Sequence, residues 1–167
     1  MAKKKRLVPD FYELKVSQIM DKRVWDLPFI EEDEDIHHVL NILAGRSHIW
    51  VVKTRKDCEL AGVITEHDVL SILAPKKLPA YGIGMPDIRS FHHGTAQTAG
   101  DIMKSKIVSC NCDDKVKDVL TKMTKFQLRR LPIVDGTKII GELTLHQLIH
   151  KFYRATQYYP ITEDEEG

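Results

Sequence analysis

The sequence predicts an α/β fold made of two βαββα units that are related by a pseudo-twofold axis and packed through their sheets. Three observations lead to this prediction. A set of landmarks occurs twice, in the same order, along the 167 residues. Helix-periodic apolar stripes alternate with short β-branched runs in both copies. Each copy is also too short to bury its own apolar face, so the two copies are expected to share a core.

The duplicated landmarks stay nearly in register along the chain. Ile19-Met20 recurs as Ile102-Met103, 83 residues later, and Gly62 recurs as Gly141, 79 residues later. The register falls by about three residues around Leu27-Pro28-Phe29, where the first copy carries an insertion. A single long-period duplication therefore accounts for most of the chain.

Each copy is expected to contain one amphipathic helix early in the unit. Apolar residues recur at helical spacing over 36–43 and over 116–123. The acidic run over 31–35 precedes the first of these helices and suits the positive end of its dipole. Asp113 or Asp114 is the expected N-cap of the second helix.

A β-hairpin is expected after each of these helices. The β-branched runs predict strands over 49–52 and 59–64 in the first copy, and over 131–134 and 138–143 in the second. Asp135-Gly136 is a strong hairpin-turn signal between the later pair. A second helix is expected over about 66–73 and over 145–155.

These elements predict the domain organisation of the chain. We expect an N-terminal arm over 1–14, a first domain over 15–74, a linker over 75–97, a second domain over 98–155 and an acidic tail over 156–167. Four residues near the arm, Phe11, Tyr12, Leu14 and Val16, are expected to pack on the core. The linker contains His92-His93 and is long enough to be functional or mobile.

Composition and charge exclude several classes of protein. The net charge of +1 gives no general attraction to nucleic acid or membranes, and no apolar run reaches the ~18 residues of a membrane span. No signal-peptide core follows the basic Lys3–Arg6, so a cytoplasmic protein is expected. The odd set Cys58, Cys110 and Cys112 predicts buried or half-buried free thiols. His146 and His150 are expected to be packing or surface residues, and neither a metal site nor a catalytic constellation is expected, so the protein is not predicted to be an enzyme.

The order Ile-Met, short strand, helix, Leu-Pro-Ile-Val, hairpin, Gly-x-x-Thr and helix resembles the CBS domain. Two in tandem resemble a Bateman module, and with no catalytic domain before or after them the chain looks like a stand-alone CBS pair. The resemblance implies a regulatory module that binds an adenosine-containing ligand, such as AMP, ADP, ATP or S-adenosylmethionine, in the cleft between the copies. It further implies no required cofactor, homodimers, and a regulated partner protein whose identity is open.

The resemblance also implies which residue holds the ribose. The family pattern Gly-x-x-Thr/Ser-x-x-Asp is intact from Gly62 to Asp68, with Thr65 at its centre. An ionised carboxylate can accept hydrogen bonds from both ribose hydroxyls, whereas the amide of Gln147, which follows Thr144 in the second copy, offers one acceptor. Both turns also fit a helix capping box, although an Asp side chain is short for that reach.

By the same resemblance, the base of a ligand held by Asp68 is expected near Ile107 and Val108, clamped with Ile64. Arg129 and Arg130 are expected to face its phosphates, although their position near a helix end also suits the helix dipole. The second site is expected to be degraded: Gln147 replaces the Asp, Ser47 and His48 replace the arginines, and Trp25 replaces the Val108-like residue. Trp25 either stacks on a base or fills that pocket, and filling is favoured.

Two other functions remain open. Paired CBS units without a ligand would serve as a dimerisation or interaction module, which the loss of the second Asp favours. A nucleic-acid binder would use the Lys3–Arg6 arm together with Arg129 and Arg130, and the net charge of +1 weighs against it.

Overall fold

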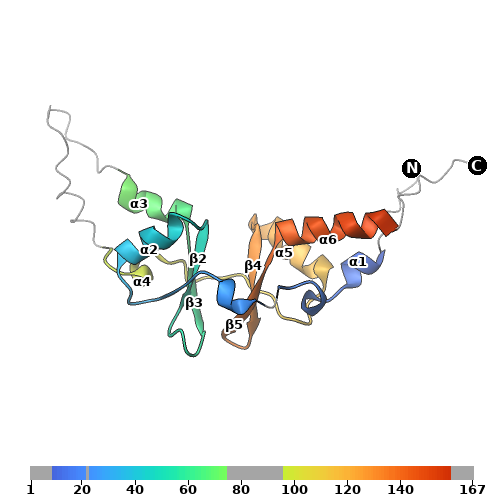
Figure 1. Ribbon diagram of the computed structural model, residues 1–167, viewed down its shortest axis with the longest axis horizontal. Helices are drawn as coiled ribbons and strands as arrows, with labels where there is room; N and C mark the ends of the chain where they lie inside the picture. Colours follow the sequence, from blue (N-terminus) through green and yellow to red (C-terminus); the bar gives the residue numbers. More distant parts are fainter. Residues whose placement is uncertain (1–8, 22, 75–95, 159–167) are drawn as a thin grey trace, which may run out of the picture. The chain divides into compact units, whose positions relative to one another are not determined.

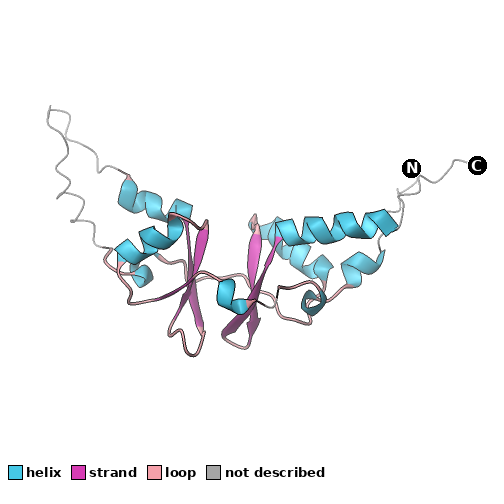
Figure 2. Cartoon of the chain, viewed as in Figure 1, coloured by secondary structure: helices cyan, strands magenta, loops and turns pink. Residues whose placement is uncertain are grey.

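The computed structural model describes residues 9–21, 23–74 and 96–158 of the chain (Figure 1). The chain divides into two compact units. Unit 1 combines Met1–Trp25 with Val108–Gly167, and unit 2 is the continuous stretch Asp26–Ile107. Each unit combines strands with helices, as the colours of Figure 2 show, which confirms the predicted α/β class. The basic arm, most of the expected linker with His92-His93, and the acidic tail lie outside the described residues.

Unit 2 follows the predicted order of strand, helix, strand, strand and helix. Its sheet has the order β1-β2-β3, with β1 parallel to β2 and β2 antiparallel to β3. Every residue of β2 is buried, as predicted for a strand that is covered on both faces. The elements of the unit are β1 (Phe29–Glu31), α2 (Ile36–Leu43), β2 (His48–Val52), β3 (Leu60–Thr65), the 3₁₀ helix η3 (Glu66–Val69), α3 (Leu70–Leu73) and α4 (Ala99–Ile102).

Helix α2 begins where the acidic run ends. The side chain of Asp35 is the N-cap and accepts the backbone N–H of His37 at 2.7 Å. This bond satisfies one of the amide groups that the first turn of a helix leaves without an internal partner. The apolar stripe then faces the core, where Val39 has no exposed surface.

Unit 1 contains the second hairpin and the longest helix. Strands β4 and β5 are antiparallel, and Gly136 occupies the turn between them with φ of +61°, which confirms the Asp-Gly hairpin. The elements of the unit are α1 (Pro9–Glu13), the 3₁₀ helices η1 (Val16–Gln18) and η2 (Val24–Asp26, which ends one residue into unit 2), α5 (Val116–Phe126), β4 (Arg130–Asp135), β5 (Lys138–Thr144) and α6 (Leu145–Tyr158).

The leading strand expected in the second copy is reduced to one parallel bridge, between Cys110 and Ile133. Two hydrogen bonds form it: Cys110 N–H to the Pro132 carbonyl at 3.0 Å, and Val134 N–H to the Cys110 carbonyl at 2.9 Å. Pro132 has no N–H, so the ladder cannot continue upstream. In the first copy Trp50 stands at this position and donates to the Pro28 carbonyl at 2.8 Å, which allows β1 to form.

The expected N-cap of α5 is also wrong. The N-cap is Lys115, without a side-chain capping bond, and the N–H of Val116 donates instead to the carbonyl of Leu14 at 2.9 Å. Asp114 lies one residue too early and accepts from Lys122 Nζ at 2.9 Å. Backbone supplied by the N-terminal segment therefore replaces the side-chain cap that the local sequence suggested.

The opening segment of each sequence repeat packs in the unit that contains the rest of the other repeat. We call this arrangement the exchange of first segments. Met103, from the second Ile-Met landmark, lies against Gly62 in unit 2, and Met20, from the first, lies against Gly141 in unit 1. A Cβ added to Gly62 would lie 2.9 Å from Met103 Cβ, and one added to Gly141 would lie 2.8 Å from Met20 Cε. Gly62 is therefore required by the close approach of Met103, whereas the atom closest to Gly141 is the flexible end of the Met20 side chain.

The N-terminal residues belong to the core of unit 1. Phe11 is 3% exposed and its ring lies 5.2 Å from that of Phe152, edge to face. Val16 has no exposed surface, so the predicted packing of this segment is confirmed for both residues. Cys110 is buried and Cys58 and Cys112 are half-buried, as expected for free thiols.

Among the residues that the structure describes, no helix combines the length and the apolar character that a bilayer crossing requires.

Candidate ligand-binding site

The Thr65–Asp68 turn joins the end of β3 to the 3₁₀ helix η3. Thr65 has an extended backbone, and η3 starts directly after it. Asp68 Oδ2 accepts two hydrogen bonds from Thr65, one from the backbone N–H at 2.8 Å and one from Oγ1 at 2.7 Å. The capping interaction that the sequence left open is therefore present, and the expectation that an Asp side chain is too short for it is wrong.

The second oxygen of Asp68 binds a residue that the sequence reasoning missed. Lys104 Nζ lies 2.7 Å from Asp68 Oδ1. The Asp68 side chain is only 7% exposed, while that of Lys104 is 59% exposed. Burial alone would raise the pKa of Asp68, but the hydrogen bonds from Lys104 and Thr65 outweigh it and hold this pKa below its usual range. Asp68 is therefore an ionised carboxylate at neutral pH.

Lys104 is held in place by the backbone of β3. Val63 N–H donates to the Lys104 carbonyl at 3.0 Å, and Lys104 N–H donates to the Val63 carbonyl at 2.9 Å. One signal in the sequence pointed to this residue: it directly follows Met103, and its counterpart after Met20 is Asp21, with the opposite charge. That signal gains a meaning only once Met103 is known to pack in unit 2.

Three further predicted residues lie in unit 2. Ile64 has no exposed surface and packs in the core, so its side chain does not line an open face of this unit. His48 is 5% exposed and its ring lies edge to face with Trp50 at 5.3 Å. Ile107 is half-buried at the end of the unit.

The equivalent turn in unit 1 is a complete capping box. Thr144 N–H donates to Gln147 Oε1 at 2.8 Å, and Gln147 N–H donates to Thr144 Oγ1 at 3.2 Å. This pair begins α6, the longest helix of the described structure. Gln147 therefore has a structural role that needs no ligand.

The two predicted phosphate-binding arginines lie in unit 1, at the start of β4. Arg130 Nη1 lies 3.7 Å from Glu142 Oε1 on the neighbouring strand, and the Arg130 side chain is 30% exposed. Arg129 is exposed, and its carbonyl accepts the N–H of Leu145 at 2.8 Å. A phosphate role for either guanidinium stays a prediction.

Val108 and Trp25 also belong to unit 1. Val108 is half-buried and packs against the core of that unit. Trp25 is 80% exposed. The pairings of Ile30 with Val51 and of Cys110 with Ile133 place Pro28, rather than Trp25, at the position equivalent to Val108. The expected equivalence of Trp25 and Val108 is therefore wrong, and filling of a second pocket by Trp25 stays a prediction.

In chemical terms, the predicted residues fall into two sets. Unit 2 brings together Thr65, Asp68 and the additional Lys104, which offer acceptors for a diol beside one cation. Unit 1 holds Val108, Arg129, Arg130 and the capping pair Thr144 and Gln147. Within the described ranges, no three His, Cys, Asp or Glu side chains are gathered as a metal ion would require.

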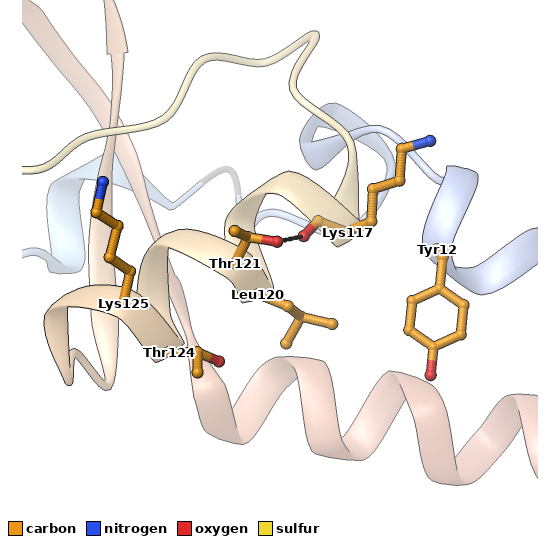
Figure 3. Close-up of a pocket in the computed structure, with 6 residues that line it drawn as sticks. All are labelled: Tyr12, Lys117, Leu120, Thr121, Thr124 and Lys125. Atoms are coloured by element: carbon orange, nitrogen blue, oxygen red, sulfur yellow. Dashed lines mark hydrogen bonds between the residues drawn. The ribbon is translucent and has the colours of Figure 1, made fainter.

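A pocket of about 480 Å³ lies elsewhere in unit 1 (Figure 3). Helix α5 supplies most of its lining and α1 supplies Tyr12, and Thr121 Oγ1 donates to the Lys117 carbonyl at 2.8 Å. None of the predicted ligand-binding residues belongs to its lining, which is Tyr12, Lys117, Leu120, Thr121, Thr124 and Lys125.

Comparison with protein families and curated proteins adds an independent observation. The family model described as the CBS domain matches residues 16–75 and 99–154. A curated relative from Thermofilum pendens, an uncharacterized 33.4 kDa protein in a ribosomal RNA operon, is 22% identical over 125 residues, which is 75% of this chain. The chain spans 36% of the length of that relative.

Solved structures share the fold. The structure of CBSX2 in complex with AMP has a TM-score of 0.66 and 19% identity, and covers 84% of this chain and 96% of its own. The CBS domain pair of protein MJ0100, in complex with 5′-methylthioadenosine and S-adenosyl-L-methionine, has a TM-score of 0.61 and 22% identity, and covers 84% of this chain and 97% of its own. At these identities the likeness shows the fold alone.

Proposed function

The chain belongs to the CBS domain family, and from this premise we propose that it is a non-catalytic regulatory module that binds an adenosine-containing ligand at Asp68. The ligand would favour one conformation of the module over another, by no more than its difference in affinity for the two. A partner protein would respond to that change. The complexes of CBSX2 with AMP and of the MJ0100 pair with methylthioadenosine and S-adenosylmethionine support this ligand class.

The observation that carries the proposal is the state of Asp68. It is an ionised carboxylate at the first turn after β3, held by two hydrogen bonds from Thr65 so that it keeps one orientation. A fixed anion of this kind is a preorganised acceptor for the two vicinal hydroxyls of a ribose. The matching turn of unit 1 carries the neutral Gln147, so we propose one competent site rather than two.

The other predicted contacts belong to the same proposal. Ile107 and Val108 would lie beside the base, and Arg129 and Arg130 would bind phosphate. The protein would need no bound cofactor and would act in the cytoplasm. Binding of nucleic acid is not favoured, because the net charge is +1.

A specific observation favours self-association as a second role. Large apolar side chains are exposed on the helices of both units: Leu73 on α3 is 60% exposed, and Ile149 and Tyr153 on α6 are 58% and 61% exposed. Exposed apolar surface of this kind is typical of interfaces. We propose a homodimer formed through helix faces, which sedimentation equilibrium of the intact protein tests directly.

Calorimetric titration tests the ligand proposal. The protein is titrated with AMP, ADP, ATP and S-adenosylmethionine, and the tightest ligand is then titrated into Asp68→Asn. This variant removes the charge and keeps an acceptor for the cap. Loss of a charge-assisted contact should weaken binding by ~10- to 150-fold.

Gln147→Ala is the matched control, because it changes the same position of the capping turn in unit 1. It should leave the affinity unchanged. The proposal fails if no adenosine ligand binds below millimolar concentration, or if Asp68→Asn binds as tightly as the original protein. Binding that depends on Gln147 and not on Asp68 would place the site in the other unit.

A further inference from the structure

We propose that Lys104 determines the ligand specificity of the Asp68 site, favouring adenosine ligands with an anionic 5′ phosphate over those whose 5′ substituent is neutral or a sulfonium cation. This inference rests on the proposed function, since it takes adenosine binding at Asp68 as its starting point. It narrows the ligand class from adenosine compounds in general to adenine nucleotides.

The position of Lys104 is fixed by its own backbone hydrogen bonds and by the packing of the residue before it. Its backbone exchanges two hydrogen bonds with Val63, at 3.0 and 2.9 Å, two residues before Thr65. The preceding Met103 lies so close to Gly62 that even a methyl group would not fit between them. The backbone that carries the Lys104 side chain is therefore as well anchored as the turn that carries Asp68.

The ammonium group of Lys104 covers the carboxylate. Its Nζ lies 2.7 Å from Asp68 Oδ1, the Asp68 side chain is 7% exposed, and the Lys104 side chain is 59% exposed. Because the anion is buried and the cation faces solvent, a ligand that approaches Asp68 meets Lys104 first.

Each oxygen of Asp68 already has a partner. Oδ2 accepts both hydrogen bonds from Thr65, and Oδ1 binds the ammonium group. A ribose diol that binds this carboxylate must share Oδ1 with Lys104 or displace its ammonium. A displaced ammonium needs another anion nearby, and a 5′ phosphate on the same ribose supplies one. A sulfonium at that position adds a second cation instead.

The fold does not require this ion pair. Unit 1 builds the same turn with Gln147 in place of Asp68 and with Asp21 at the position of Lys104. A Cβ added to Gly141 would lie 3.4 Å from the Asp21 carbonyl, so the segment that carries Asp21 also passes close to its strand. The Asp21 carboxylate binds Arg23 at 2.6 Å. The Lys104–Asp68 pair therefore distinguishes one site from the other rather than serving the capping turn.

The test compares AMP with adenosine, which differ only by the phosphate. We expect the intact protein to bind AMP more tightly than adenosine. Lys104→Met keeps most of the aliphatic stem. In this variant the Kd of adenosine divided by the Kd of AMP should fall by about 10-fold, as expected for the loss of one charge-assisted contact. The Kd of adenosine should stay the same or decrease, because the ribose no longer competes with Lys104 for Oδ1. S-adenosylmethionine should gain affinity in the same variant.

Two variants control the result. Lys106→Met removes an exposed lysine two residues further along and should leave the ratio unchanged, while Lys104→Arg should retain the preference for AMP. An unchanged ratio in Lys104→Met would overturn the inference and leave adenosine binding in place. Failure of both ligands to bind the intact protein would instead refute the proposed function. Far-UV circular dichroism verifies that each variant is folded.

Discussion

Burial and pairing give individual polar residues of this protein different chemical properties. The Asp68 carboxylate is buried beside Lys104 and stays ionised, because Lys104 and Thr65 offset the cost of burying its charge. The Cys110 thiol is more deeply buried, with 1% exposure, and among the described residues no cation is bound to it at hydrogen-bond distance; desolvation raises its pKa to about 12. A thiol with this pKa is almost entirely protonated under physiological conditions, so it behaves as a small apolar side chain.

The first prediction concerns the reactivity of the three cysteines. The thiolate is the reactive form, so Cys110 should resist iodoacetamide at about pH 8 in the native protein, whereas the half-buried Cys58 and Cys112 should be alkylated. Peptide mass spectrometry measures each site, and Cys110→Ser and Cys112→Ser distinguish the neighbouring pair. All three should react in denaturant. Native labelling of Cys110 at the rate of Cys112 would contradict the assigned burial.

At the scale of elements, each Gly-x-x-Thr turn depends on a methionine that is distant in sequence. At Gly62, an added Cβ would meet the Cβ, Cγ and Sδ atoms of Met103, all within 2.9 Å. At Gly141 the close atom is the terminal Cε of Met20, at 2.8 Å, which can rotate away. The two glycines are equivalent in sequence and differ in how rigidly the space beside them is filled.

This difference predicts unequal costs of substitution. Gly62→Ala should lower the free energy of unfolding by about 1–3 kcal/mol, because the clash involves the rigid start of the Met103 side chain. Gly141→Ala should cost less, since only a flexible methyl group must move. Gly45→Ala is the control, as nothing lies within 4 Å of its added Cβ. Urea denaturation measures all three variants, and equal losses for Gly62→Ala and Gly45→Ala would refute the explanation.

At the scale of the molecule, the units that pack are not the repeats that the sequence displays. Unit 2 is continuous over Asp26–Ile107 and includes Ala99, which follows the expected linker and has no exposed surface. Unit 1 is discontinuous, and Phe11 and Val16 from its N-terminal stretch complete its core. The CBS family model, in contrast, begins and ends with the repeats, at 16–75 and 99–154.

Fragments of the chain test this division. A fragment over 26–107 should unfold cooperatively in urea, because it contains every buried residue of its core. A fragment over 15–74, which matches the first repeat, should not, because it lacks Ala99 and Met103. Circular dichroism and the dispersion of amide proton resonances measure both. A cooperative transition in the shorter fragment alone would show that the repeat, and not unit 2, is the stable part.

Much of the fold was predictable because it depends on local signals. The helical stripes, the buried strands and the Asp-Gly hairpin are each encoded within a few residues, and all of them appear. The prediction of a leading strand in the second copy was wrong because Pro132 has no N–H to donate to that strand. This effect can be recognised only once the partner strand is known. The predicted cap of α5 was wrong for a similar reason, since the N–H of Val116 donates to the carbonyl of Leu14, more than 100 residues away.

The candidate site was predictable to the same extent. Thr65 and Asp68 lie in one turn and were identified from their spacing. Lys104 was missed because it is 36 residues from Asp68 in the sequence, and only the exchange of segments brings the two together. A contact between residues this far apart in the sequence can be predicted only when the segments that pack together are already known.

The exchange of first segments also concerns the order in which the gene encodes the protein. Each sequence repeat opens with a segment that packs on the body of the other repeat, so the repeated stretch and the packed unit begin at different residues. A circularly permuted gene that started at Asp26 and ended at Trp25, with the present ends joined by a linker, would encode each packed unit as one uninterrupted stretch. The present order of segments is therefore not the only one that could encode the same pair of units.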